Sequence, residues 1–351
     1  MNPKTRQLLL NLARILISIG LMAWVISRAG LDKLIANIRT ADPRPYALAI
    51  FLAFIGILLR AVRWQILLNA VNARVPFGRL VYLYFIGAFF NAFLPTGFGG
   101  DVVRVLEIGE GATSSQAAGT AVVDRLTGFI VLFWLALIAL PFGASLLPPA
   151  TTLMIALLAG GVTLGSVLLF EGRLLRWVTA RFPRSLSLAG DAWLGRTYGV
   201  ITACGWRAVA GALGMSAIFN LMMNFAGLLI ARAFGMDVSV WTLFLFIPVA
   251  TAALLAPISI SGLGVREGIF VTLFAQVGVA ASPAVAFSLA WYSLDFAMAL
   301  VGGVPCQLDA CCRGFMGRWG ASRRGRHGRR PGRLPQFSGP ESLEFRRREG
   351  I

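Results

Sequence analysis

The chain has 351 residues, 57% of them hydrophobic and only 13% charged, and its mean hydropathy is +0.76. A soluble globular domain is about 45–50% apolar and about 25% charged, so the composition excludes a soluble protein and predicts an all-α polytopic membrane protein. The net charge of +17 does not indicate nucleic-acid binding. The positive residues gather in the C-terminal tail and beside expected helix ends, where they signal membrane topology.

Apolar runs of about 20 residues, the length that crosses a bilayer, predict about six full spans and two interrupted ones. We expect the first run to be a retained membrane helix, because no small-residue cleavage site follows it. The full spans are expected near 8–27, 46–68, 127–147, 150–170, 206–232 and 284–304, and the interrupted segments at 80–118 and 241–280. Residues 1–308 then form the membrane domain, and 309–351 a basic Arg/Gly-rich tail that we expect to be disordered.

The two interrupted segments break in the same way, 162 residues apart. In the first, Pro95 ends an apolar run, three glycines follow, and Arg104 lies nine residues after the proline. In the second, Pro257 is followed by two glycines and, again nine residues later, by Arg266. Matching Gly/Pro interruptions in the two halves of a membrane protein point to the substrate site of a transporter, so we predict such a site at this pair.

Basic loops are expected on the cytoplasmic side of a membrane. The linker 171–207 is rich in arginine and the tail is strongly basic, whereas the turn 146–150 is uncharged. This pattern places both termini in the cytoplasm, and makes the first interrupted segment begin and end inside and the second begin and end outside. The sequence thus predicts two re-entrant hairpins that enter from opposite faces in an inverted repeat. Two ordinary helix pairs with turns at the surface are the alternative.

The loop 28–45 disagrees with this topology. It is expected outside, yet it carries four basic residues against two aspartates. The basic residues are Arg28, Lys33, Arg39 and Arg44. The other loops agree with one another, so this loop is the exception to the assignment.

Charged side chains at membrane depth are costly and usually functional. A break in a spanning helix also frees backbone amides, and the helix start that follows favours an anionic group. Arg104 and Arg266 are the strongest substrate candidates, because each directly follows a break. The candidate substrate-binding residues are Asn91, Gly97, Gly99, Gly100, Asp101, Arg104, Asp124, Arg125, Ser259, Ser261, Gly262, Gly264, Arg266, Glu267 and Asp295.

Structural pairing is the competing interpretation of these charges. Arg104 and Glu107 are three residues apart and can pair on one helix face. Arg60 and Arg63 lie near the expected cytoplasmic end of the second span, where a long side chain is expected to snorkel to the interface.

The sequence offers little chemistry for catalysis or for a bound cofactor. Its one histidine lies in the basic tail, and the glycine run 97–100 lacks the Gly-Lys-Ser/Thr of a nucleotide-binding loop. The four cysteines lack the histidine partners and the spacing of a zinc site. We therefore predict no catalytic residues, no metal and no cofactor.

Both interruptions resemble the signatures of one family. Asn91-Ala-Phe-Leu-Pro95 with Gly100-Asp101 and Arg104, followed by Ala121-Val-Val-Asp124-Arg125-Leu, resembles the first signature of the lysylphosphatidylglycerol synthase transmembrane-region family. Pro257-Ile-Ser-Ile-Ser261-Gly262-Leu-Gly264-Val-Arg266-Glu267 resembles the second. The resemblance covers roughly residues 8–305. Asp124 departs from it, because a glutamate is common at that position.

The resemblance implies a flippase-like protein of the bacterial inner membrane, similar to the flippase half of the multiple peptide resistance factor. That factor carries a soluble aminoacyl-transfer domain after its membrane part, whereas this chain has only the short basic tail there. We therefore expect no transferase activity. The partner that the resemblance implies is an anionic or headgroup-modified lipid of the bilayer.

Four hypotheses of function follow. The first is a translocator that moves such a lipid between leaflets. The second is a membrane enzyme that modifies a lipid headgroup or a polyprenyl carrier, which needs an acid–base pair among Asp101, Glu107 and Asp124. The third is a non-catalytic scaffold for lipid-biosynthesis enzymes, with the basic tail binding anionic lipid. The fourth is transport of a small solute.

Overall fold

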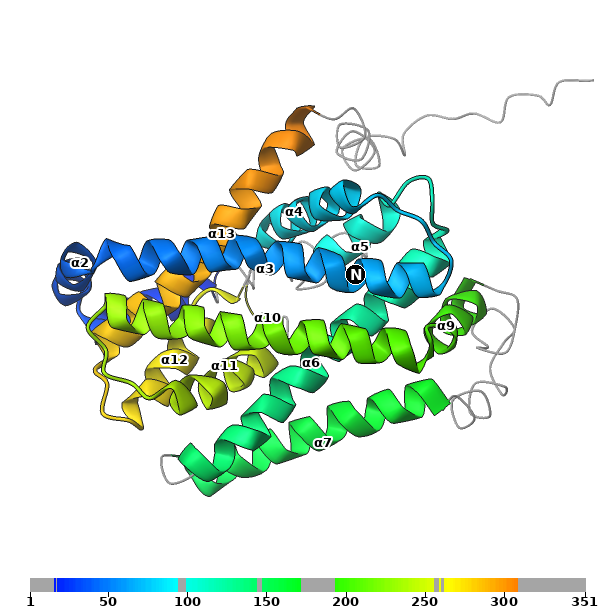
Figure 1. Ribbon diagram of the computed structural model, residues 1–351. Coiled ribbons are helices and arrows are strands. Elements are labelled where there is room, and N and C mark those ends of the chain that lie inside the picture. Colours follow the sequence, from blue (N-terminus) through cyan, green and yellow to red (C-terminus); the bar gives the residue numbers. More distant parts are fainter. Residues whose placement is uncertain are drawn as a thin grey trace, which may run out of the picture. The chain divides into compact units, whose positions relative to one another are not determined.

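The computed structural model describes residues 16, 18–93, 99–143, 147–171, 193–255, 259 and 262–308. Five helices in these residues are long and apolar enough to cross a membrane (Figure 1). They are α3 (Pro43–Ala70), α6 (Ser114–Gly143), α7 (Pro149–Glu171), α10 (Gly205–Ala233) and α13 (Ala281–Leu308). They correspond to five of the six predicted full spans, and the prediction of an all-α polytopic membrane protein is confirmed. Contacts group Met1–Pro305 into one unit, described below, and Cys306–Ile351 into another.

The first predicted span, 8–27, lies partly outside the described residues. Its described end is the apolar helix Ser18–Ala29, which continues beyond the predicted limit at residue 27. The chain then turns at Gly30, whose φ of 78° is favourable for glycine and unfavourable for other residues.

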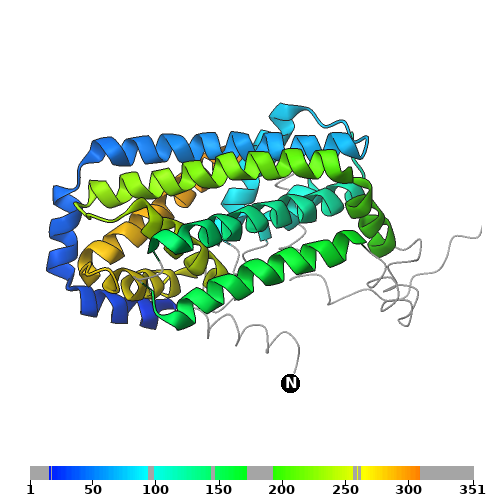
Figure 2. The ribbon, with the colours of Figure 1, turned by 60° about the horizontal axis from the view of Figure 1, so that its bottom comes forward.

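α3 and α10 form the frame of the membrane unit, side by side and in opposite directions along most of their lengths (Figures 1 and 2). Gly56 of α3 permits the close approach, because a Cβ atom there would lie 3.1 Å from the ring of Phe219 on α10. α6 packs on both of them and also on α7. Large side chains such as Trp64 and Phe287 are fully buried in the interior that these helices enclose.

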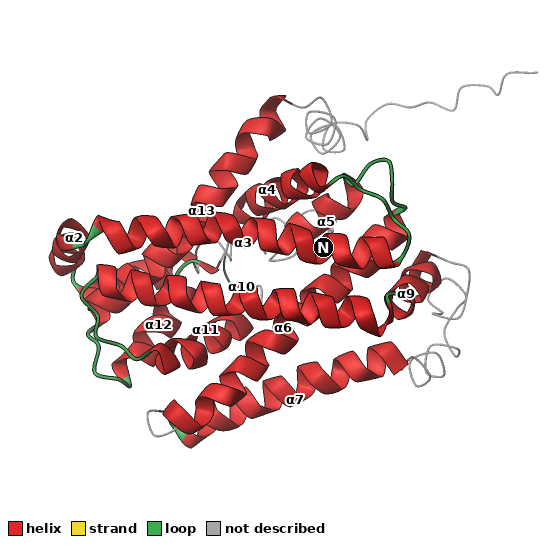
Figure 3. Cartoon of the chain, viewed as in Figure 1, coloured by secondary structure: helices red, strands yellow, loops and turns green. Residues whose placement is uncertain are grey.

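The shorter helices complete the described structure, which is helical in all its regular elements (Figure 3). They are α2 (Leu31–Thr40), α4 (Phe77–Phe93), α5 (Gly99–Leu106), α9 (Trp193–Ala203), α11 (Val240–Leu254) and α12 (Val265–Ala275). α4 and α5 flank the first predicted interruption, and α11 and α12 flank the second. At about 1.5 Å per residue, none of these four helices extends more than about 26 Å, which is less than the roughly 30 Å hydrocarbon core of a bilayer.

Each interrupted segment folds back on itself, since α4 packs on α5 and α11 packs on α12. α5 approaches α4 closely: the backbone N–H of Gly100 donates to the side-chain oxygen of Asn91 at 2.7 Å, and a Cβ on Gly100 would lie 2.1 Å from the carbonyl oxygen of Gly87. Residues 94–98, with Pro95, and residues 256–258, with Pro257, lie outside the described residues. Entry of the two hairpins from opposite faces of the membrane stays a prediction.

The helix after the first hairpin begins at Ser114, well before the predicted start near 127. Two glycines with positive φ, Gly109 and Gly111, reverse the chain. The Thr113 hydroxyl then accepts a hydrogen bond from the Gln116 N–H at 3.2 Å, and the Gln116 side chain accepts one from the Thr113 N–H at 2.8 Å. This reciprocal cap starts α6, and it places Asp124 inside a long helix instead of at the beginning of one.

Two segments that the charge pattern marks as loops contain helices. The loop 28–45 contains α2, and the linker 171–207 contains α9. α9 belongs to the packed body: a Cβ on Gly119 of α6 would lie 2.8 Å from the Thr197 carbonyl oxygen, and the Tyr198 hydroxyl donates to the Leu169 carbonyl at 2.8 Å. Charge indicates the side of the membrane on which a segment lies, but it does not reveal whether the segment is helical.

Candidate functional site: a charged cavity between the two halves

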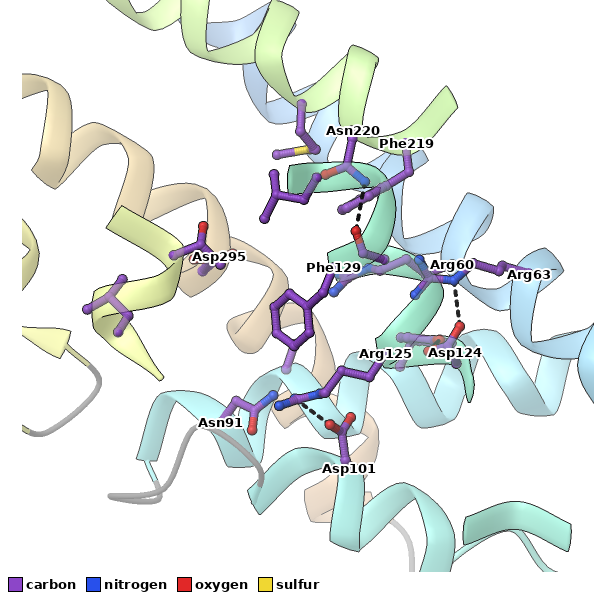
Figure 4. A pocket seen from close by; sticks show the side chains of 18 of the residues that line it. Arg60, Arg63, Asn91, Asp101, Asp124, Arg125, Phe129, Phe219, Asn220 and Asp295 are labelled. Carbon is purple, nitrogen blue, oxygen red and sulfur yellow. Dashed lines mark hydrogen bonds and ion pairs between the residues drawn. The ribbon is translucent and has the colours of Figure 1, made fainter. Parts of the chain in front are cut away.

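A cavity of about 440 Å³ lies among α3, α4, α5, α6, α10, α11 and α13, and so receives residues from both halves of the chain (Figure 4). Its volume is within the range of about 300–1,000 Å³ typical of small-molecule sites. Aromatic and aliphatic side chains form much of the wall, Phe129, Phe219 and Trp291 among them. The charged residues in the wall are Arg60, Arg63, Arg104, Arg125, Asp101, Asp124 and Asp295. Four arginines face three aspartates, which leaves one net positive charge.

Asp124 of α6 is the centre of the buried charges. It is 3% exposed, and its Oδ1 accepts from Arg63 Nε of α3 at 2.6 Å. Its Oδ2 accepts from the Tyr84 hydroxyl of α4 at 2.8 Å and lies 3.8 Å from Arg104 Nη2 of α5. A buried carboxylate is tolerated when its oxygens are paired in this way. Four helices therefore meet at one side chain.

Asp101 extends the charge network from α5 to α6. Its Oδ1 lies 2.6 Å from Arg104 Nη2, one turn later on α5, and its Oδ2 pairs with Arg125 of α6. The predicted pairing of Arg104 with Glu107 is wrong, because Arg104 pairs towards the start of α5 instead. The Glu107 carbonyl accepts from Arg79 Nη2 at 2.6 Å.

The predicted snorkelling of Arg63 to the membrane interface is wrong as well. Arg63 is 5% exposed, and its Nη1 donates to the Ser216 hydroxyl of α10 at 2.9 Å, in addition to its ion pair with Asp124. Arg60, one turn earlier, turns into the same cavity. Part of the signal for this arrangement was present in the sequence, because two arginines three residues apart share one helix face. The position of Asp124 inside α6 was not predicted, since the expected span began after it.

Two guanidinium nitrogens in the cavity wall have no hydrogen-bond partner among the described residues: Arg60 Nε and Arg104 Nη1, both buried. The two guanidinium groups lie over the ring of Tyr84, at 5.4 and 4.0 Å from its centroid. Arg104 also lies 4.8 Å from the ring centroid of Trp64. Aromatic rings attract these cations but accept no conventional hydrogen bond from Nε or Nη1, so both donors are unpaired within the described residues.

Asp295, the third acid of the cavity, differs from Asp101 and Asp124 in its surroundings. Asp295 of α13 is exposed, and Figure 4 shows it apart from the labelled arginines. It takes no part in the ion pairs of the described residues. The cavity wall between Asp295 and the arginines is largely apolar and includes Phe129 (Figure 4). The cavity therefore offers cationic donors at one place and a carboxylate at another.

Residues of the second interruption form a separate cluster that does not line this cavity. Glu267 is fully buried, with its two carboxylate oxygens accepting from the Gly264 N–H at 2.6 Å and from the Ser288 hydroxyl at 3.1 Å. It thereby fixes the start of α12 against α13. The Arg266 guanidinium lies 5.0 Å from the ring centroid of Tyr292, and Gly264 packs closely on Leu21.

The structure thus divides the predicted binding residues into three groups. Those that line the cavity are Asn91, Asp101, Arg104, Asp124, Arg125 and Asp295. Those placed elsewhere in the described structure are Gly99, Gly100, Ser259, Gly262, Gly264, Arg266 and Glu267. Gly97 and Ser261 lie outside the described residues. Sequence analysis did not identify Tyr84, whose ring lies under the guanidinium groups of Arg60 and Arg104. An isolated tyrosine in an apolar helix gives no indication of such a role.

Within the described part of the chain, no three His, Cys, Asp or Glu side chains gather in a way that would hold a metal ion. The acids of the cavity are engaged instead with arginines, with the exception of Asp295. The chemistry on offer is the binding of charged groups.

Comparisons with known proteins place the chain. A model of the family described as the lysylphosphatidylglycerol synthase TM region matches residues 11–303, and this model covers a membrane region alone. The UPF0104 membrane protein PH1989 of Pyrococcus horikoshii is 32% identical over 120 residues, which are 33% of this chain and 36% of that protein. The match thus spans little more than a third of the curated relative. No solved structure matches the chain. The protein is a multi-pass membrane protein, and it belongs to the family of the lysylphosphatidylglycerol synthase TM region.

Proposed function

We propose that the protein is a lipid translocator, which moves a lipid with an anionic or modified headgroup between the two leaflets of a bacterial inner membrane, with both termini in the cytoplasm. The single observation that carries the proposal is the pair of buried, unpartnered donors, Arg60 Nε and Arg104 Nη1, in one cavity. Buried polar groups are otherwise nearly always hydrogen-bonded, and an unmet buried donor is destabilising by about 1–3 kcal/mol. A headgroup phosphate, which has several acceptor oxygens, is the kind of group that guanidinium donors bind.

The charge of the cavity supports the same conclusion. Asp101 and Asp124 neutralise two of the three arginines in the ion-pair network, Arg63, Arg104 and Arg125. One positive charge of the network and that of Arg60, which also lines the cavity, remain for a bound anion, and hydrogen bonds to such charged groups are strong. The carboxylate of Asp295 offers a partner for a cationic group on a modified headgroup.

The polar cavity within an apolar bundle also suits the task of a translocator. A headgroup that crosses the bilayer loses its hydration, and the cavity replaces water by guanidinium donors. The apolar wall residues, Phe129, Leu132 and Ile247 among them, suit the glycerol and acyl portions of the same molecule. No step in this process needs a covalent change in the lipid.

The alternative of a lipid-modifying enzyme has weaker support. Asp124 accepts from Arg63 and Tyr84 and lies beside Arg104, and Asp101 is paired twice. Carboxylates whose oxygens are already engaged by arginines are poorly placed to exchange a proton with a substrate. The third acid of that hypothesis, Glu107, does not line the cavity.

The test is movement of fluorescent lipids between the leaflets of liposomes that contain the purified protein. Anionic, zwitterionic and aminoacylated lipids are compared in the same preparation. We expect Arg104→Gln to slow the movement of anionic lipid about tenfold or more, which corresponds to a loss of about 1.4 kcal/mol or more of binding in the rate-limiting state. Arg60→Gln, which breaks no ion pair in the network, is expected to slow it in the same direction.

Arg266→Gln is the matched control, because Arg266 also has a buried donor without a partner among the described residues, its Nη1, but lies beside the second interruption and outside the cavity. It should leave the rate within about twofold of the unaltered protein. Equal rates for Arg104→Gln, Arg60→Gln and the unaltered protein would contradict the assignment of the site. The absence of movement for every lipid in the unaltered protein would contradict passive translocation.

A further inference from the structure

α2 occupies a particular place in the membrane unit. It joins the apolar helix Ser18–Ala29 to α3, with only Gly30 before it and residues 41–42 after it. Figures 1 and 2 show its axis running across the end of α3 and α10. We expect a short helix that connects two apolar helices and lies across their ends to lie at the edge of the bilayer.

One side of α2 is fixed to the protein. Leu34 is 4% exposed and packs in a cluster with Val25, Val285 and Ala286. Asn37, one turn later, donates from Nδ2 to the Ser282 hydroxyl near the start of α13 at 2.8 Å. The rotation of α2 about its own axis is therefore set by these two residues.

A second side of α2 is apolar and uncovered. Leu31, Ile35 and Ile38 are 56%, 41% and 51% exposed. Their spacing of four and three residues places them in one stripe along the helix, next to the side that Leu34 occupies. No described residue covers this stripe.

The third side of α2 is polar and carries most of its charge. Asp32, Lys33, Arg39 and Thr40 are all exposed. The segment 28–45 as a whole has four basic residues against Asp32 and Asp42, and Asp42 is engaged at the start of α3, where its side chain accepts from the Arg44 N–H at 2.9 Å. Positive charge thus prevails beside the apolar stripe.

We propose that α2 is an interfacial helix that binds the anionic lipid surface of the leaflet at which it lies. The stripe of Leu31, Ile35 and Ile38 lies among the upper acyl chains, and Lys33 and Arg39 contact the lipid phosphates. An apolar stripe flanked by basic residues is the pattern of helices that lie in the plane of a membrane surface, and basic residues near such a surface are attracted by anionic lipid. This inference does not depend on lipid translocation.

The proposal also accounts for the one loop that disagreed with the charge-based topology. Four basic residues in 28–45 were unexpected on the outer side of the membrane. In a helix that lies on the bilayer they contact headgroups, so their charge serves a local purpose and gives no signal of sidedness.

The experiment places a fluorophore at single cysteines on the two free sides of α2. Ile35→Cys and Ile38→Cys probe the apolar stripe, and Ala36→Cys and Thr40→Cys probe the polar side. The background chain carries Cys306→Ser, Cys311→Ser and Cys312→Ser. Cys204 is retained, because it is buried between α9 and α10 and burial raises the pKa of its thiol to about 11, which slows its labelling relative to an exposed cysteine.

The labelled proteins are reconstituted in vesicles of phosphatidylcholine with phosphatidylglycerol and exposed to two quenchers. One is a nitroxide attached to the acyl chain of a lipid, and the other is a nitroxide dissolved in water. We expect positions 35 and 38 to be quenched several-fold more by the lipid nitroxide, and positions 36 and 40 several-fold more by the aqueous one. Equal accessibility of all four positions to water would overturn the proposal. Shielding of 35 and 38 from both quenchers would also overturn it, in favour of a second copy or another protein as the occupant.

The charge part of the proposal has its own measurement. Nitroxides on phosphatidylglycerol and on phosphatidylcholine are compared as quenchers of the label at position 38, in vesicles that contain both lipids. We expect phosphatidylglycerol to be favoured, by up to about fivefold for each basic residue near the surface, and Lys33→Gln with Arg39→Gln to reduce the preference at least twofold. Arg196→Gln with Arg207→Gln removes two exposed charges from α9 and α10 and should change nothing. A preference that survives Lys33→Gln with Arg39→Gln would contradict the role of these charges.

Discussion

Replacing Asp124 by alanine is expected to lower the free energy of unfolding by about 3–5 kcal/mol, the range for removing one partner of a buried ion pair. The substitution leaves Arg63 Nε and the Tyr84 hydroxyl without their acceptor, at a place where four helices meet. It also removes the nearest negative charge from Arg63, which is only 5% exposed. Thermal unfolding of the protein in detergent, followed by circular dichroism, measures the change.

A double-mutant cycle separates this cause from a general loss of packing. Arg63→Ala alone is also expected to destabilise the protein, but Arg63→Ala with Asp124→Ala should be less destabilising than the two single changes added together, because it leaves no uncompensated charge. Asp295→Asn alters an exposed carboxylate of the same cavity outside the ion-pair network, and should change the free energy of unfolding by no more than about 0.5 kcal/mol. Strictly additive effects would refute the coupling of Arg63 with Asp124.

Among substitutions that add a single methyl group near the cavity, we expect Gly100→Ala to lower the stability of the protein most. The new Cβ would lie 2.1 Å from the Gly87 carbonyl oxygen and 2.7 Å from Asn91 Nδ2. The first of these is backbone of α4 and cannot turn aside, so α5 must move away from α4. We expect a loss of about 1–3 kcal/mol of stability or more, together with loss of lipid movement, because Asp101 and Arg104 shift with α5.

Gly78→Ala provides the matched control in α4. A Cβ on Gly78 would meet nothing within 4 Å, and alanine is the better helix former. The control should therefore be neutral or slightly stabilising and should leave lipid movement unchanged. Equal behaviour of the two alanine variants in unfolding and in transport would show that the approach of α5 to α4 does not matter.

The number and class of the long helices could be predicted because length and apolarity suffice to identify a spanning helix. The boundaries were less predictable where turns are made by side chains. α6 starts at Ser114 because of the hydrogen bonds between Thr113 and Gln116. The hydropathy of the preceding residues, 107–113, gives no indication that a membrane helix begins there. α2 and α9 were missed for a related reason, since both are short helices in segments whose charge suggested loops.

The first interruption predicted the cavity better than the second. Charges after Pro95 and in the following span, Asp101, Arg104, Asp124 and Arg125, converge on one place. Arg266 and Glu267 follow an almost identical pattern, yet Glu267 satisfies the start of its own helix and Arg266 lies on Tyr292. Sequence symmetry predicts where a chain breaks. It does not predict whether the side chains beside the break turn towards a ligand or towards their own backbone, because that depends on the partner that each acid finds.

The cavity has two unlike walls, which differ in how easily their helices can shift against one another. The wall formed by α3, α5 and α6 is joined by ion pairs through Asp101 and Asp124, and a shift of one of these helices would separate buried charges. α11 contributes the apolar residues Ile247 and Leu254, whose non-directional contacts tolerate sliding. We therefore expect the helices of the charged wall to shift only together, whereas α11 can shift against them without separating buried charges.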